Sequence, residues 1–214
     1  KKKKCLGFIN GPISKKTFLK GNYYGITEYL AAKTKTSDPV MLIFNKNLSV
    51  CPLTTHIPIS KVEKKIKKIT IIKKVNKIHL FYKNFFKKRP KIAITGLNPH
   101  CENFGTLDIE RKEILPAIDY LEKKRINVRG PFAADTIFLK ENIKKFDVII
   151  GMYHDQVLTP IKTLFGFDAI NITLGLPFIR ISPDHGPNVQ MLGKNKSDPK
   201  SLIESMLFFK KYGI

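Results

Sequence analysis

The sequence lacks any apolar run long enough to cross a membrane, since no stretch of about 18 apolar residues occurs. Few apolar residues separate the opening lysines, Lys1 to Lys4, from Asn10, which is too short a run for the core of a signal peptide. Cysteine is scarce: Cys5, Cys51 and Cys101 show no Cys-x-x-Cys spacing and predict neither a disulfide framework nor a thiolate zinc site. We therefore expect a cytoplasmic chain with no membrane partner.

Acidic residues are also scarce, because 17 Asp and Glu stand against 39 Lys and Arg and give a formal net charge of +22. Such a charge is typical of proteins that bind nucleic acids or anionic membranes. Arginine, whose planar fork serves specific phosphate and base recognition, supplies only a small minority of these cations. The lysines are spread in pairs along the whole chain. The charge therefore predicts solvation and general attraction of anionic substrates, and no nucleic-acid site.

The glycine fingerprint G-x-G-x-x-G is absent as well, so a dinucleotide would not bind here as it does in a Rossmann domain. What the sequence does contain is an alternation of short β-branched runs with stretches of helical period, which predicts an α/β protein with a largely parallel sheet. A hairpin expected from the runs 40–45 and 48–55 makes that sheet mixed. No linker marks a boundary within 1–214. The remaining predicted strands are 5–10, 91–97, 147–153, 169–174 and 178–182.

Three amphipathic helices are predicted. The first runs from Ser60, which has a capping-box partner in Glu63, to Phe85. The second covers 109–124, and the last begins at Pro199 behind Asp198 as the cap. Apolar spacing predicts the residues that face the core. They are Val62, Ile66, Ile69, Ile72, Val75 and Ile78 in the first helix, and Leu202, Met206 and Phe209 in the last.

Three of the five histidines, His56, His100 and His154, follow predicted strands. Ligands of open α/β sheets bind beyond the carboxyl ends of the strands, so these imidazoles can converge on one metal ion. A hydrogen-bonded structural role is the alternative, and spacing alone does not decide. Asp155 adjoins His154, and Asp135 follows another short strand; such carboxylates orient imidazoles, complete metal shells or act as general bases. A helix or turn cap is an equal reading of Asp135.

Lys162, Asn171 and Arg180 are spaced nine residues apart and form a second candidate group. A cation, an amide and a guanidinium near one sheet edge are suited to a phosphorylated amino acid, because Arg and Lys pair phosphate and carboxylate through charge-assisted hydrogen bonds. A solvated surface trio is the alternative. The apolar setting of Arg180 argues against that alternative, since an unpaired charge is costly there.

The order and approximate spacing of seven segments resemble the 4-hydroxythreonine-4-phosphate dehydrogenase family, and the match runs from about Ile9 to Met206. The fifth and sixth segments are the most specific. The seven are Gly11-Pro12-Ile13-Ser14-Lys15, Thr54-Thr55-His56, Gly96-Leu97-Asn98-Pro99-His100, Gly130-Pro131 with Ala134-Asp135-Thr136, Met152-Tyr153-His154-Asp155-Gln156, the string from Asn171 to Arg180, and Asp184-His185-Gly186.

The resemblance implies an isocitrate-dehydrogenase-like α/β fold, with a mixed, mostly parallel sheet flanked by helices and incomplete at the N-terminus. The chain then corresponds to the C-terminal two-thirds of the family's length. It also implies an obligate homodimer whose active site is shared between subunits. The divalent metal, zinc, cobalt, manganese or magnesium, would be held by His56, His100 and His154.

The reaction implied is oxidation of the 3-hydroxyl of 4-phosphooxy-L-threonine with NAD or NADP. The product, 2-amino-3-oxo-4-phosphooxybutanoate, then loses carbon dioxide to give 3-amino-2-oxopropyl phosphate. The family's substrate contacts correspond to Thr27, Lys162, Asn171 and Arg180. Asp135, Asp155 and Lys162 are the expected catalytic residues, with the two carboxylates supporting metal ligands or transferring protons.

Two departures from the family pattern affect the expected site. Ile26 stands where many members have a histidine that contacts substrate, and the glycine-rich loop after His100 is shortened to the segment from Cys101 to Gly105. Three alternatives therefore remain: a sister dehydrogenase of 4-phosphothreonate or 4-phosphoerythronate, an inactive remnant, and an RNA-binding protein that uses the lysine-rich helix from Ser60 to Lys88. The last would need aromatic residues interleaved with Arg on one face, and these are absent.

Overall fold

The computed structural model describes residues 7–23, 25–101, 108–186 and 189–212. They belong to two compact units, although no linker in the sequence marks a boundary. Unit 1 combines residues 1–45 with residues 165–214, and unit 2 is the continuous segment 46–164 between them. Among the described residues, none of the helices combines the length and the apolar character that a bilayer span requires.

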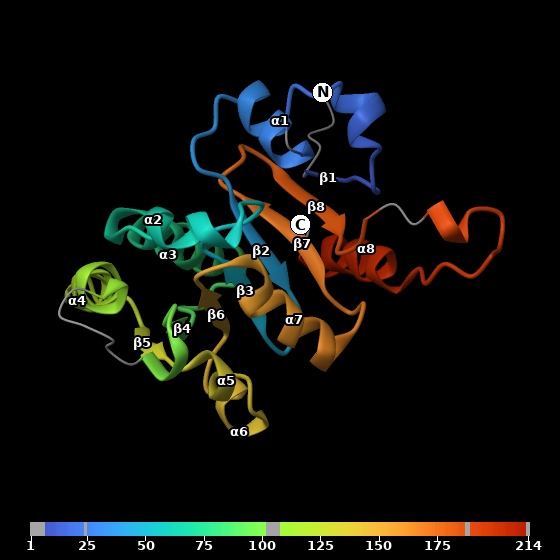
Figure 1. Cartoon of the computed structure of the whole chain (residues 1–214). Helices are drawn as coiled ribbons and strands as arrows, with labels where there is room; N and C mark the ends of the chain where they lie inside the picture. The colour runs from blue at the N-terminus through green and yellow to red at the C-terminus, as the bar shows by residue number, and fades with distance from the viewer. Residues whose placement is uncertain (1–6, 24, 102–107, 187–188, 213–214) are drawn as a thin grey trace, which may run out of the picture. The chain divides into compact units, whose positions relative to one another are not determined.

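Unit 2 is built on four strands that lie side by side (Figure 1). Their order is β3 (Ser49–Pro52), β6 (Val148–Gly151), β4 (Ile92–Thr95) and β5 (Val128–Phe132). Each neighbouring pair is parallel. Every residue of β3, β4 and β6 is buried, as expected of a parallel sheet covered on both faces. Because these strands are parallel, the segments that follow them leave the sheet at one edge.

The helices of unit 2 follow its strands in alternation. A π-helical turn, η4, runs directly into α4, which packs against β5 and α3. Short 3-10 turns precede α2 and follow β4. The elements are η2 (Ile59–Lys61), α2 (Val62–Lys65), α3 (Lys68–Phe85), η3 (Pro99–Cys101), η4 (Glu110–Ile114), α4 (Leu115–Lys123), α5 (Ala134–Ile137), α6 (Lys140–Ile143) and α7 (His154–Phe165).

The prediction of one continuous helix from Ser60 to Phe85 is wrong. Ile66 is buried and has extended backbone angles (φ −76°, ψ 111°), which break the helix between α2 and α3. The expected capping box does not form, because neither η2 nor α2 has a side-chain cap. Instead, Glu113 accepts a hydrogen bond from the backbone N–H of Lys68 (2.6 Å) at the start of α3. The break shifts the helical phase and leaves Ile69 59% exposed, while the other predicted core positions of this stretch are buried.

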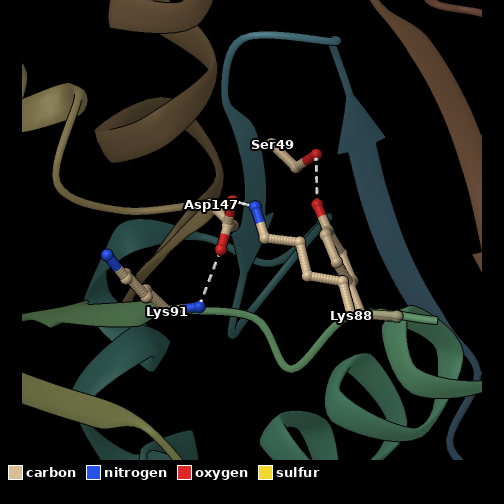
Figure 2. Close-up of polar contacts among 5 residues, drawn as sticks. Ser49, Lys88, Lys91 and Asp147 are labelled. Atoms are coloured by element: carbon tan, nitrogen blue, oxygen red, sulfur yellow. Dashed lines mark hydrogen bonds and ion pairs between the residues drawn. The ribbon is translucent and has the colours of Figure 1, made fainter. Parts of the chain in front are cut away.

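Asp147, just before β6, links the end of α3 to the start of β4 (Figure 2). Its carboxylate accepts a hydrogen bond from Lys88 Nζ (2.5 Å) and one from the backbone N–H of Lys91 (2.9 Å). In the same region the Tyr82 hydroxyl donates to Ser49 Oγ (2.9 Å), a buried bond between α3 and β3. These contacts fix the lysine-rich helix to the sheet of unit 2.

Unit 1 contains the antiparallel part of the sheet. Its strand order is β1 (Gly7–Ile9), β8 (Ile179–Pro183), β7 (Ile170–Leu174) and β2 (Val40–Phe44). β1 is parallel to β8, whereas β7 is antiparallel to both β8 and β2. With the parallel strands of unit 2, this arrangement confirms the predicted mixed, mostly parallel sheet. The remaining elements are η1 (Lys15–Leu19), α1 (Ile26–Lys33), η5 (Val189–Met191) and α8 (Lys200–Tyr212).

The predicted inward face of the last helix, α8, is wrong. Leu202 and Met206 are 41% and 50% exposed. The helix packs on β7 and β8, and the Ser201 hydroxyl donates to the carbonyl oxygen of Ala169 (2.7 Å). Its buried residues are Ser201, Ser205 and Phe208.

Candidate active-site residues in two clusters

His56 and His154 lie together at the carboxyl edge of the parallel strands in unit 2. The segments that carry them continue side by side beyond β3 and β6, because Leu53 N–H bonds the carbonyl of Gly151 (2.7 Å) and the Thr54 hydroxyl bonds the carbonyl of Met152 (2.8 Å). The two imidazole rings are 5.7 Å apart between centroids and inclined by 42°. Two histidines separated by almost a hundred positions therefore form a pair.

Asp155 supports His154 from the first turn of α7. A carboxylate oxygen of Asp155 lies 2.7 Å from His154 Nδ1. A carboxylate in this position favours the tautomer with the proton on Nδ1, which leaves the Nε2 lone pair for a metal ion or a substrate proton. Asp155 therefore acts on its histidine neighbour, as a carboxylate behind a metal ligand does.

His100 pairs with the other candidate carboxylate. It lies on η3 beyond β4, and its Nδ1 atom is 3.5 Å from Asp135 Oδ2. Asp135 opens the short helix α5 but provides no side-chain cap to it, so its contact favours a role beside His100. Among the described residues, no three His, Cys, Asp or Glu side chains lie close enough to hold one metal ion. One chain thus forms two imidazole–carboxylate pairs and does not bring the predicted histidine triad together.

A cavity of about 570 Å³ lies between α5 and α7 in unit 2. Asp135 and Asp155 both line it, together with Tyr153 and Thr159. Lys162 lies two turns beyond His154 on the same helix. The two candidate catalytic carboxylates therefore face a space that can admit a small ligand.

Arg180 is the centre of the second cluster, in unit 1. Its side chain is only 2% exposed. Nε donates to Asn10 Oδ1 (2.6 Å), and an Nη atom donates to Thr173 Oγ1 (3.0 Å) and to Thr27 Oγ1 (3.5 Å). Burial lowers the pKa of Arg180 to about 10, against an opposing effect of the Glu28 carboxylate. The guanidinium therefore stays charged at neutral pH, and the three acceptors around it are neutral.

Asn171 lies on the same face of the sheet as Arg180. In the antiparallel register, Thr173 is opposite Arg180 and Asn171 is opposite Ser182, and directly opposed residues share a face. The Asn171 Oδ1 atom is buried and has no hydrogen-bond partner in the described part of the chain. A buried acceptor of this kind is costly unless a ligand or water donates to it.

The structure thus brings Thr27, Asn171 and Arg180 together in unit 1, whereas Lys162 belongs to unit 2. Asn10 and Thr173 also bond to Arg180 and are not among the residues predicted for the site, although Asn10 adjoins one family segment and Thr173 lies within another. Ile26 opens α1 immediately before Thr27. Most of the shortened loop, residues 102–107, falls outside the described residues.

A family model matches almost the whole chain. Residues 1–208 match the family model described as pyridoxal phosphate biosynthetic protein PdxA. The 4-hydroxythreonine-4-phosphate dehydrogenase of Sulfurihydrogenibium sp. (strain YO3AOP1) is 43% identical over 208 residues, which cover 95% of this chain and 64% of that protein. The crystal structure of 4-hydroxythreonine-4-phosphate dehydrogenase from Klebsiella pneumoniae is 32% identical with a TM-score of 0.83, over 96% of this chain and 64% of that one.

Two further matches bear on substrate and fold. A protein of Oceanobacillus iheyensis, named provisionally as D-threonate 4-phosphate dehydrogenase, is 39% identical over 95% of this chain and 62% of its own length. Isocitrate dehydrogenase from Methylococcus capsulatus shares the fold, with a TM-score of 0.58 at 11% identity over 96% of this chain. This likeness confirms the predicted isocitrate-dehydrogenase-like fold. The chain spans less than two thirds of the length of the curated relatives it matches.

Proposed function

Because the chain belongs to the PdxA family of pyridoxal phosphate biosynthetic proteins, we propose that it carries the active-site residues of a cytoplasmic, metal-dependent dehydrogenase. The substrate is 4-phosphooxy-L-threonine. Its 3-hydroxyl carbon gives a hydride to NAD or NADP and its hydroxyl gives up a proton. The product, 2-amino-3-oxo-4-phosphooxybutanoate, releases carbon dioxide to form 3-amino-2-oxopropyl phosphate.

The observation that carries this proposal is the pairing of His56 with His154, with Asp155 behind His154. Neutral imidazoles suit a divalent ion such as zinc, cobalt or manganese, and they leave the ion most of its positive charge. When bound, a divalent ion supplies Lewis acidity toward the substrate hydroxyl and the ketone formed from it. The donor atoms of the pair fit such an ion, and magnesium is the less natural occupant.

We propose that the site is completed in a homodimer, with His56, His100 and His154 as its ligands. Within the described part of one chain the third ligand is not in reach of the first two. A second copy of the chain can supply the missing imidazole, that of His100. A two-fold axis would then give each of the two sites one imidazole from the other subunit. The active site is then shared between the subunits.

The charged side chains of unit 2 position groups and move protons. Asp155 holds His154 in the tautomer that exposes Nε2, and Asp135 lies beside His100, 3.5 Å from its Nδ1 atom. Lys162 anchors the phosphate or carboxylate of the substrate, and its ammonium group can also donate a proton. Both carboxylates line the cavity beside α7, where a proton released by the substrate can be passed to water.

The Arg180 cluster binds the anionic end of the substrate. A buried guanidinium whose hydrogen bonds go to neutral oxygens favours an incoming phosphate or carboxylate over any apolar group. The hydroxyl of Thr27 lies at the start of α1, where backbone N–H groups also attract anions. Asn171 Oδ1 is suited to accept a hydrogen bond from the substrate ammonium or hydroxyl.

A sister activity on 4-phosphothreonate or 4-phosphoerythronate is the second candidate. One observation favours it, namely the 39% identity with the protein named for D-threonate 4-phosphate. Ile26 adds to this case, because its apolar side chain cannot make the contact for which many family members use a histidine. Both activities require the same metal site and the same anion site, so they differ only in the substrate that is turned over.

The experiment is to purify the chain, measure bound metal by elemental analysis, and follow NAD and NADP reduction with each of the three phosphorylated acids. His154→Ala is the test variant. Asp119→Asn, which changes an exposed carboxylate on α4, is its control. We expect about one metal per chain and turnover, both lost in His154→Ala and retained in the control.

Other outcomes separate the alternatives. Turnover only with a phosphorylated sugar acid supports the sister activity. The chain could bind metal without turning over substrate. If turnover then appears when the remaining third of a relative is fused to the chain, catalysis requires that segment. If both the wild-type chain and the fusion lack bound metal and turnover, the dehydrogenase function is contradicted and an inactive remnant is supported.

A further inference from the structure

The loop that carries His100 has an unusual backbone. Both His100 (φ 55°) and Cys101 (φ 58°) adopt left-handed conformations, which side chains other than Gly, Asn and Asp disfavour. The loop also turns back tightly, because a Cβ atom added to Gly96 would lie only 2.7 Å from Cys101 Sγ. A strained segment of this kind persists only where its surroundings determine it.

Glu110 makes one set of the contacts that surround this loop. Its side chain is 1% exposed, and Oε1 accepts hydrogen bonds from the backbone N–H groups of Leu97 and Asn98, both at 2.8 Å. Oε2 accepts a third from the Asn98 side chain at 2.9 Å. All three hydrogen bonds are donated by Leu97 and Asn98, the two residues that precede Pro99 and His100. The buried Glu110 carboxylate therefore accepts its hydrogen bonds from the loop.

Gln156, in the first turn of α7, makes a second set of contacts around this loop. Its Oε1 accepts hydrogen bonds from Met152 N–H (2.6 Å) and from the Thr95 hydroxyl (2.8 Å). Its Nε2 donates to the carbonyl oxygen of Gly96 (2.8 Å). Gln156 is two residues from His154, and Gly96 begins the loop to His100. One side chain therefore joins the segments that carry the two histidines.

We propose that Glu110 and Gln156 are positioning residues of the metal site, which hold His100 in place relative to the start of α7. This inference rests on the proposed metal-dependent function and assigns two residues to it that touch neither metal nor substrate. Because His100 and His154 lie on segments linked through Gln156, a shift in one moves the other. If the two histidines serve different sites of a dimer, the same link connects those sites.

The test separates positioning from general stability by measuring Co²⁺ binding and amide hydrogen exchange. Co²⁺ is titrated into the metal-free chain and its affinity and visible absorption spectrum are recorded, because absorption reports the geometry of the ligands. Glu110→Leu and Gln156→Leu should weaken Co²⁺ binding by about 10–100-fold, the range found for residues that support metal ligands. The exchange of the Leu97 and Asn98 amides should rise in both variants.

Two milder variants sharpen the result if the first pair folds poorly. Gln156→Glu keeps the acceptor for Met152 and Thr95 but sets an oxygen against the Gly96 carbonyl, so it should weaken Co²⁺ binding as Gln156→Leu does. Glu110→Gln keeps one acceptor oxygen for the loop and should recover most of the affinity. A matched structural control is Tyr82→Phe, which removes the buried bond to Ser49 (Figure 2) and should change neither readout.

The proposal is overturned if the Glu110 and Gln156 variants bind Co²⁺ within about twofold of wild type, whatever their thermal stability. Failure of the proposed function looks different. Wild type would then bind no Co²⁺ and turn over no substrate. In that case the exchange experiment still decides, since unchanged exchange at Leu97 and Asn98 in Gln156→Glu shows that Gln156 does not hold the loop.

Discussion

The Nδ1 atom of His154 lies 2.7 Å from the carboxylate of its chain neighbour Asp155. Asp155→Asn keeps the shape of the side chain and removes its charge, so the preference for the Nδ1–H tautomer weakens. We expect about a 10–100-fold loss in Co²⁺ affinity, measured by titration of the metal-free chain. Asp119→Asn, which changes an exposed carboxylate on α4, is the control. Equal affinity in both variants would contradict a supporting role for Asp155.

Arg180 gives a prediction about substrate affinity. Arg180→Lys keeps the charge and loses the fork, and Arg180→Met loses both, so KM for the phosphorylated substrate should rise at least about tenfold in the first and further in the second. Stability to urea should change by less than about 2 kcal/mol in Arg180→Met, because removing a buried charge offsets the lost hydrogen bonds. Arg129→Met, on an exposed position of β5, should change neither. An unchanged KM in Arg180→Met would contradict the anion site.

His79 predicts a pH dependence of stability. Its Nδ1 atom is buried without a hydrogen-bond partner among the described residues, and burial, followed by Lys83 and Arg89, lowers its pKa. Below about pH 6.5 the unfolded chain takes up this proton before the folded chain does, so the free energy of unfolding falls as the pH falls. His79→Leu should flatten the slope by at most about 1.4 kcal/mol per pH unit. Urea unfolding between pH 5 and 8 measures the free energy of unfolding of wild type and His79→Leu, with His185→Gln as control. The same pH dependence in wild type and His79→Leu would contradict the prediction.

A shared metal site predicts complementation between inactive variants. His100→Ala and His154→Ala are each expected to be inactive. After unfolding and refolding together, each mixed dimer has one site with all of its ligands, so an equal mixture should recover about a quarter of wild-type activity. Size-exclusion chromatography confirms the dimer, and separate refolding of each variant is the control. No recovery in a mixture that does form dimers would mean that each site takes its ligands from one chain.

The strands were the most predictable part of the fold. Buried parallel strands appear in a sequence as short continuous apolar runs, and the runs that contain β4 and β6 are predictable for this reason. Helix phase was less predictable. The break at Ile66 depends on Glu113, a distant carboxylate that caps α3, and the inward face of α8 depends on the close approach that Ser201 permits.

The candidate site could be predicted in its residues more than in its geometry. Parallel strands bring their ends to one edge, so the spacing of His56 and His154 after two strands was informative. Their separation from His100 was not, since the loop before His100 bonds to Glu110 and Gln156, and no local pattern marks these contacts. The same limit holds for Asn10 beside Arg180, because a contact between residues so far apart in the chain leaves no spacing to recognise.

The interruption of unit 1 by unit 2 has a consequence for synthesis on the ribosome. Val40 in β2 pairs with Leu174 in β7, so β2 emerges on the order of ten seconds before its partner at ordinary translation rates. Unit 2 is continuous in sequence and can close its parallel strands during that delay. A nascent chain therefore carries an apolar strand whose edge toward β7 is open, the form of intermediate that chaperones bind and that aggregates when translation stalls.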